Sequence, residues 1–181
     1  MGQALEFGKE KLIVGIIYHD QEVYKKAISR LVERFGKIED EGCEYSFSKE
    51  YTDYYDTELG GEGMRKIISF KECVDPALAA EIKVFTNLIE QENSDTFGRK
   101  INLDPGLMNQ GRLVLMSTKD SGFRIPLKKG IYAELTLFYA KGAWQKLPWT
   151  YRDYQSERTH KFLLSVRKKY MAERKRTLSN L

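Results

Sequence analysis

An uninterrupted apolar run near the start of the chain constrains the fold more than any other feature. Residues 11–18 read KLIVGIIY. A strand with one face in water alternates apolar and polar residues, whereas a strand buried on both faces is apolar throughout. We therefore expect residues 11–18 to form a buried strand in the centre of a sheet.

The elements that follow are predicted from apolar spacing and from residues that start or stop helices. Asp20 can cap a helix over residues 21–35, in which apolar residues recur at helical spacing. Residues 44–51 and 65–74 are expected to be strands, and Asp75-Pro76 then starts a second helix. Residues 100–103 are expected to form a short strand that ends in the turn Asp104-Pro105-Gly106. This β-α-β-β-α-β order predicts an α+β protein with a ferredoxin-like (split βαβ) core and an antiparallel-rich sheet.

Further strands and a basic helix are expected after this core. Residues 113–118 form another apolar strand, and residues 124–127 and 131–139 flank Lys128-Lys129-Gly130 as a hairpin. Residues 142–153 (GAWQKLPWTYRD) are predicted to be an aromatic loop, and residues 155–174 a basic helix. We expect residues 1–181 to form one domain, with a basic, partly frayed tail from about residue 174.

Composition indicates a globular chain whose positive charge is concentrated at one end. Hydrophobic residues make up 41% of the 181 residues and charged residues 31%, a balance typical of folded proteins. Residues 157–181 contain eight Lys or Arg and two Asp or Glu, a net charge of +6. The overall charge of +4 therefore leaves −2 for residues 1–156, so that part of the chain lacks a broad basic surface.

Cysteine and histidine contents exclude several classes of site. Cys43 and Cys73 are far apart, which fits neither a disulfide framework nor a zinc pattern. His19 and His160 are too few for a typical histidine metal site, so we assign no metal ligands, and no pattern identifies a cofactor. The sequence has no apolar segment resembling a signal peptide or a bilayer span. We therefore expect a cytoplasmic protein without a membrane partner.

Several motifs, in a fixed order, resemble those of one family. The motifs are Asn102-Leu103-Asp104-Pro105-Gly106, Thr118-Lys119-Asp120, Gly130-Ile131-Tyr132-Ala133-Glu134, Leu147-Pro148-Trp149-Thr150-Tyr151 and Asp153-Tyr154. Over about residues 11–170 the chain resembles the prokaryotic family of uncharacterised proteins called domain of unknown function 4416. Members of that family often carry His where this chain has Phe123, and Pro where it has Arg152. The resemblance implies no established reaction.

A set of charged residues near predicted strand ends is the best candidate for a ligand site. The set comprises Asp104, Lys119, Asp120, Arg124 and Glu134. Glu134 lies within an apolar strand, where an unpaired carboxylate is costly, and Lys119 or Arg124 could pair with it. In the functional interpretation, Arg124 and Asp120 contact an anionic ligand, and Glu134, Asp104 and Lys119 are catalytic. In the structural interpretation, the same residues form an ion pair and ordinary turns.

Other residues extend this candidate site. We assign ligand binding also to Asn102, Tyr132 and Trp149, which lie in or near the same predicted strands and loops. Asn87 is assigned too, because on the second predicted helix it could face a ligand at the end of the sheet; the alternative is a solvated or helix-capping role. Exposed aromatic residues can stack on a ring, although such residues more often cover the core. Gly60, Gly61 and Gly63 could expose N–H groups to a phosphate, but the ordinary interpretation is a flexible loop.

Three functions from different classes remain open at this point. The first is a small-molecule binding protein, or an enzyme, that uses the charged set on an anionic or nucleotide-like ligand. The second is a nucleic-acid-associated protein that uses the basic helix. The third is a homodimeric structural module that pairs through an exposed strand edge.

Overall fold

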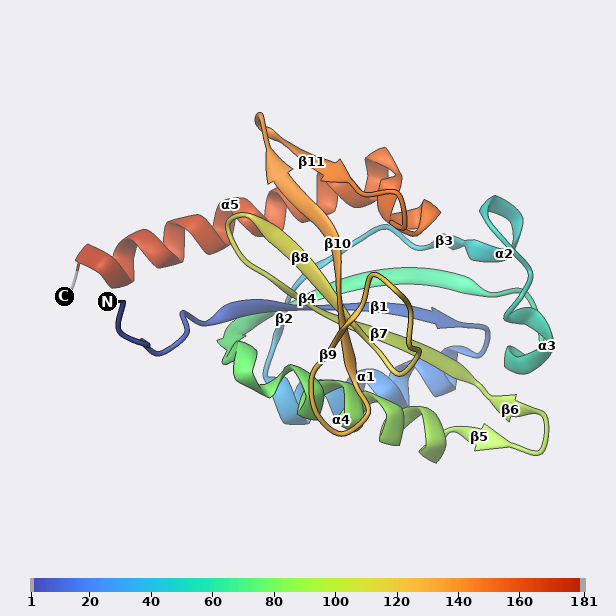
Figure 1. Cartoon of the computed structure of the whole chain (residues 1–181). Helices are drawn as coiled ribbons and strands as arrows, with labels where there is room; N and C mark the ends of the chain where they lie inside the picture. Colours follow the sequence, from blue (N-terminus) through green and yellow to red (C-terminus); the bar gives the residue numbers. More distant parts are fainter. Residues whose placement is uncertain (1, 180–181) are drawn as a thin grey trace.

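One antiparallel sheet organises the chain in the computed structural model, which describes residues 2–179 and the side chains of residues 2–176. Seven strands follow the order β11-β10-β8-β7-β1-β4-β2, while β3 pairs with β4 and β9 pairs with β10 (Figure 1). The strands are β1 (Glu10–Tyr18), β2 (Ile38–Glu41), β3 (Tyr45–Ser46), β4 (Met64–Val74), β7 (Ile101–Met108), β8 (Arg112–Ser117), β9 (Ile125–Pro126), β10 (Tyr132–Ala140) and β11 (Ala143–Lys146). The short strands β5 (Ser94–Asp95) and β6 (Gly98–Arg99) form a separate hairpin.

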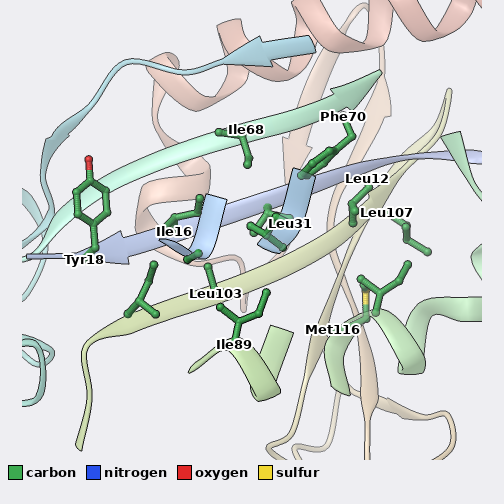
Figure 2. Close-up of a cluster of buried hydrophobic side chains, with 14 of the residues drawn as sticks. Leu12, Ile16, Tyr18, Leu31, Ile68, Phe70, Ile89, Leu103, Leu107 and Met116 are labelled. Carbon is green, nitrogen blue, oxygen red and sulfur yellow. The ribbon is translucent and has the colours of Figure 1, made fainter. Parts of the chain in front are cut away.

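Strand β1 lies in the centre of the sheet, as the apolar run predicts. It pairs with β4 on one side and β7 on the other, and all nine of its residues are buried. Its even-numbered side chains, from Leu12 to Tyr18, join the larger hydrophobic core shown in Figure 2. Ile13 joins a second core on the opposite face. Coverage on both faces is the physical reason for the run without polar alternation.

Helices cover both faces of this sheet. The long helices are α1 (Gln21–Phe35), α4 (Ala79–Glu92) and α5 (Glu157–Ser179). Shorter ones are α2 (Phe47–Glu50), α3 (Asp56–Leu59), η1 (Pro76–Leu78) and η2 (Arg152–Gln155). Helices α1 and α4 pack on one face, and α5 crosses the other (Figure 1). The result is an α+β protein in three layers.

The predicted helix starts are confirmed by their hydrogen bonds. The side chain of Asp20 accepts from the backbone N–H groups of Glu22 and Val23, and that of Asp75 accepts from Ala77. These caps satisfy N–H groups that have no partner within the helix. Gly36 ends α1 with a φ of 84°, a backbone conformation that favours glycine.

The prediction that Asp104-Pro105-Gly106 forms a turn is wrong, because all three residues lie inside β7. Pro105 is opposite Val14 of β1, whereas β7 pairs with β8 only from Gly106 to Met108. On its other side Pro105 therefore has no strand partner, so the N–H that proline lacks removes no hydrogen bond from the sheet.

Three further boundaries differ from the predictions. Residues 44–51 are not one strand, because the Ser46 hydroxyl accepts from the N–H of Lys49 and starts α2 directly after β3. The predicted aromatic loop contains β11, whose Trp144 is buried in the core on the α5 face. Helix α5 continues to Ser179, five residues past its predicted end at Arg174, and residues 180–181 of the predicted tail lie outside the described part of the chain. None of the helices described is long and apolar enough to cross a membrane.

Candidate functional site

A small cavity lies where strands β7 and β8 separate. The two strands pair only at Gly106–Met108, so Asp104 on β7 and Ser117 on β8 diverge from each other. The cavity between them has a volume of about 80 Å³. Its charged lining residues are Arg65, Asp104, Arg124, Glu134 and Asp153, and its aromatic ones are Phe47, Tyr55, Tyr151 and Tyr154.

Gly15 makes room for the arginine at the base of this cavity. Gly15 of β1 lies directly opposite Asp104 of β7, and Arg65 comes from β4 on the other side of β1. A Cβ atom on residue 15 would lie 2.6 Å from Nη2 of Arg65 and 2.8 Å from the hydroxyl of Tyr154. The missing side chain therefore lets Arg65 cross β1 and reach Asp104.

Arg65 is a fully buried cation held between two carboxylates. Nη1 donates a hydrogen bond to Oδ2 of Asp104 at 3.2 Å, and Nη2 lies 2.9 Å from Oδ2 of Asp153. The rings of Phe47 and Tyr154 lie on the guanidinium at 5.8 and 5.4 Å from their centroids. Burial opposes the charge of Arg65, but Asp153 and its other neighbours hold its pKa above the ordinary value. Arg65 therefore stays charged.

The two oxygens of Asp104 have different surroundings. Oδ2 accepts from Arg65 and also from Nδ2 of Asn102 at 2.9 Å. No donor from the described residues reaches Oδ1, and the side chain retains 35% of its exposure. Two donors therefore fix the orientation of the carboxylate, while Oδ1 stays available to a ligand.

The side chain of Arg124 connects three segments around the cavity through hydrogen bonds. Its guanidinium donates to Oε2 of Glu134 at 2.8 Å, to the hydroxyls of Ser117 and Tyr151 at 3.0 and 2.7 Å, and to the carbonyl of Lys119 at 2.8 Å. Nη2 also lies 2.8 Å from Glu134. These contacts occupy the donors of the side chain almost completely.

Several buried polar atoms at the cavity have no hydrogen-bond partner among the described residues. They are Nε of Arg65, Oδ2 of Asp153 and the hydroxyls of Tyr154 and nearby Tyr45. Oδ2 of Asp153 is close to Arg65 but lacks the alignment of a hydrogen bond. Buried polar atoms are nearly always satisfied, and a cluster of exceptions often marks a ligand or water site.

Burial changes the proton affinity of the groups around Arg65. It raises the pKa of Asp153 above the ordinary value, although the charge of Arg65 acts in the opposite direction. Burial also raises the pKa of Tyr154, and that of Tyr55 to about 12. Asp153 is thus the member of the ion pair that takes up a proton when the pH falls.

The structure brings together three of the predicted catalytic and binding residues and separates others. Asp104, Arg124 and Glu134 all line the cavity. Lys119 does not line it, because its side chain is exposed and only its backbone N–H and carbonyl join the network. Asp120 is likewise exposed, outside the cavity lining.

The remaining predicted ligand contacts lie behind or beside the cavity. Nδ2 of Asn102 donates a hydrogen bond to Oδ2 of Asp104, so Asn102 orients this carboxylate. Asn87 belongs to α4, on the opposite face of the sheet from Arg65 and α5. Tyr132 is half-buried on β10 outside the lining, and Trp149 donates to the carbonyl of Leu135 at 2.9 Å and stacks on Phe123.

The glycine-rich loop offers little to a phosphate. The N–H of Gly63 donates to the hydroxyl of Ser48 and to Oδ1 of Asp56, and the N–H of Gly61 donates to the carbonyl of Asp56. These bonds use N–H groups that a phosphate would need. Among the described residues, no three His, Cys, Asp or Glu side chains gather as metal ligands would.

Several positively charged side chains of the basic helix α5 contact the rest of the protein. Arg158 pairs with Glu50, Lys169 pairs with Asp40, and Arg167 donates to the carbonyl of Gln110. Leu163, Val166 and Tyr170 are buried in the core beneath the helix. Helix α5 is therefore a packed layer of the fold, and Arg158 and Lys169 already pair with carboxylates of the body.

Comparison with known families gives one match, over nearly the whole chain. The family model described as Domain of unknown function (DUF4416) matches residues 8–170. The chain belongs to this family. The resemblance inferred from the ordered motifs is thereby confirmed, and in this DUF4416 chain the matched span includes every residue that lines the cavity. Searches of curated proteins and of solved structures gave no match.

Three buried residues of the site, Arg65, Asp153 and Tyr154, are not among the site residues predicted from the DUF4416 sequence. The sequence places Arg65 only at the start of the predicted strand 65–74, and Asp153 only within a family motif. One signal could have located Arg65, namely the glycine at position 15 within an apolar strand. A glycine inside a buried strand often leaves space for a neighbouring group.

Proposed function

We propose that the chain binds a small polar molecule in the cavity between β7 and β8, and that Asp104 contacts this molecule directly. The observation that carries the proposal is the difference between the two oxygens of Asp104 in hydrogen bonding and in access. Arg65 and Asn102 hold Oδ2, and Oδ1 is left accessible at the cavity. An oriented carboxylate with one open oxygen is typical of a binding or proton-transfer group.

An anionic ligand, predicted from the sequence, has less support. That prediction relies on free N–H groups of Arg124, but four hydrogen bonds already engage this guanidinium. The carboxylate of Glu134, proposed from the sequence as catalytic, already accepts hydrogen bonds from Arg124 and Thr136. We therefore propose that Glu134 positions Arg124.

Acid–base catalysis is a second candidate function, favoured by the contrast between two carboxylates. Asp153 is buried beside Arg65, whereas Asp104 retains access to solvent on the other side of the same guanidinium. Carboxylates in different environments can hold and accept protons at the same pH. If the ligand is a substrate, Asp104 is the group that would take a proton from it.

We further propose that the core is a ferredoxin-like unit and that the protein is cytoplasmic. The order β7-β1-β4-β2, with every neighbouring pair antiparallel and helices α1 and α4 on one face, supports the first proposal. The unpaired cysteines Cys43 and Cys73 support the second. Association with nucleic acid has weaker support, since Arg158, Arg167 and Lys169 bind the body of the protein.

Thermal denaturation in the presence of a library of small polar molecules tests the binding proposal. Ligands that raise the midpoint of wild-type unfolding should do so equally in Asp120→Asn, whose site is exposed and outside the cavity. They should have little effect on Asp104→Asn. At a ligand concentration of about 100 times the Kd, binding adds about 2.7 kcal/mol to the free energy of unfolding. Equal shifts in Asp104→Asn would show that Asp104 is not the contact.

A further inference from the structure

We propose that the molecule bound in this cavity carries a positively charged amino group, and that the ammonium sits against Asp104 and Asp153. This inference rests on the proposed function and names the chemistry of its ligand. It follows from three independent properties of the cavity, namely its charge, its unused acceptors and its aromatic walls.

The charges that line the cavity do not balance. Asp104, Glu134 and Asp153 supply three negative charges, and Arg65 and Arg124 supply two positive charges. Four of these five side chains are at most 7% exposed, so water screens the remaining negative charge poorly. A ligand with one positive charge restores neutrality, whereas an anion would double the imbalance.

The unused hydrogen-bonding groups are mainly acceptors. Oδ1 of Asp104 has no donor among the described residues, and Oδ2 of Asp153 lacks a hydrogen bond although the residue is only 4% exposed. The Tyr154 hydroxyl, also unpartnered, can accept as well. An ammonium has three N–H donors and can serve these three oxygens, whereas an ionised carboxylate has none.

The walls and the size of the cavity suit the same group. Tyr55 and Tyr151 line it with aromatic rings, and a cation gains stabilisation over the face of such a ring. Its volume of about 80 Å³ admits an ammonium with a short carbon chain, while a larger body would have to extend through the open side.

Three probes of similar size, each with a short alkyl chain, separate the chemistry of the ligand from binding itself. They are propylammonium, propanol and propionate, titrated into protein labelled with ¹³C at its methionine methyl groups. Met116 lines the cavity, whereas Met108 is buried outside it and serves as an internal reference. We expect propylammonium to shift the Met116 signal saturably, with a Kd at least tenfold below those of the alcohol and the carboxylate. Tenfold corresponds to about 1.4 kcal/mol.

Substitutions test the same contact. Asp104→Asn should weaken propylammonium binding about tenfold or more, and the exposed control Asp120→Asn, which removes the same charge, should leave it unchanged. Unchanged signals of Met108 would confirm that the variant is folded. The preference of the wild-type protein among the probes requires no variant, so the proposal is testable even if Asp104→Asn does not fold.

The outcomes distinguish this inference from the proposed function. Tighter binding of propionate or propanol than of propylammonium would overturn the cationic ligand and leave the cavity as a binding site. The same conclusion holds if none of the probes moves Met116 while other molecules still stabilise the protein through Asp104. Absence of both responses would overturn both proposals.

Discussion

Gly15 shows how the absence of a side chain in a central strand leaves room for large side chains from other elements. Its bare Cα lets Arg65 and Tyr154 occupy space that any side chain would fill. We expect Gly15→Ala to lower the free energy of unfolding by about 2 kcal/mol, because overpacking a close-packed interior forces groups apart. Urea denaturation measures the change. The control is Gly122→Ala, where an added Cβ meets nothing within 4 Å. Equal stability of the two variants would contradict the close packing around Arg65.

The pair of Arg124 and Glu134 gives a second test at this scale. Both side chains are at most 7% exposed, so removing one charge leaves the other buried without compensation. We expect Arg124→Met to cost about 3 kcal/mol in the free energy of unfolding, and the double variant with Glu134→Leu to regain much of this loss. The two are compared by chemical denaturation. A double variant less stable than Arg124→Met would indicate that Glu134 has an essential partner besides Arg124.

Individual residues of the sequence predict part of the site. Glu134 stands out because a carboxylate in an apolar strand needs a partner, and Arg124 is the partner that it has. Asp104 stands out as a charged residue at the predicted end of a strand. Lys119 could not be excluded from spacing alone, because the direction of its side chain depends on a loop. Arg65 and Asp153 meet only after β4 and η2, which are far apart in the sequence, are brought together by the fold, a long-range arrangement that no local pattern records.

For helices and strands, sequence patterns predicted the structure correctly where the pattern reflects burial of a strand or capping of a helix. The apolar run of β1 and the caps at Asp20 and Asp75 belong to this class. The Asp104-Pro105-Gly106 segment was wrongly predicted to be a turn. Residues typical of turns can occupy this part of β7 because the strand has no hydrogen-bonded partner there on one side. That missing pairing also separates β7 from β8 and opens the cavity, so the misjudged element and the site share one physical cause.

The end of helix α5 supplies a prediction at this scale. Tyr170 is the last buried side chain among those described on the helix. Truncation after Glu173, which keeps the ion pair of that residue with Lys11, should therefore change the melting temperature by no more than about 2 °C. By contrast, Leu163→Ala should cost about 3 kcal/mol, because it leaves a cavity in the core. A large loss on truncation would mean that the last turns pack on the body.

For the whole molecule, buried tyrosines predict sensitivity to alkali. Burial raises the pKa of seven of the eleven tyrosines, namely Tyr18, Tyr24, Tyr45, Tyr55, Tyr151, Tyr154 and Tyr170. Above pH 10 the unfolded chain releases these protons first, so the free energy of unfolding falls as the pH rises. Each such group contributes up to about 1.4 kcal/mol per pH unit.

Tyrosinate absorbance and circular dichroism, followed together from neutral to alkaline pH, check this expectation. The late part of the rise in absorbance should coincide with the loss of secondary structure, because the buried phenols ionise only on unfolding. Complete ionisation with the dichroism unchanged would show that these tyrosines are accessible in the folded protein.

Crystals of the protein soaked with a set of small polar fragments, amines among them, would show whether the cavity binds a ligand through Asp104. We expect electron density in the cavity between β7 and β8, with a fragment donor within hydrogen-bond distance of Oδ1 of Asp104. Fragments that bind elsewhere, such as the groove beside Tyr170 and Arg174, and never contact Asp104 would contradict this expectation.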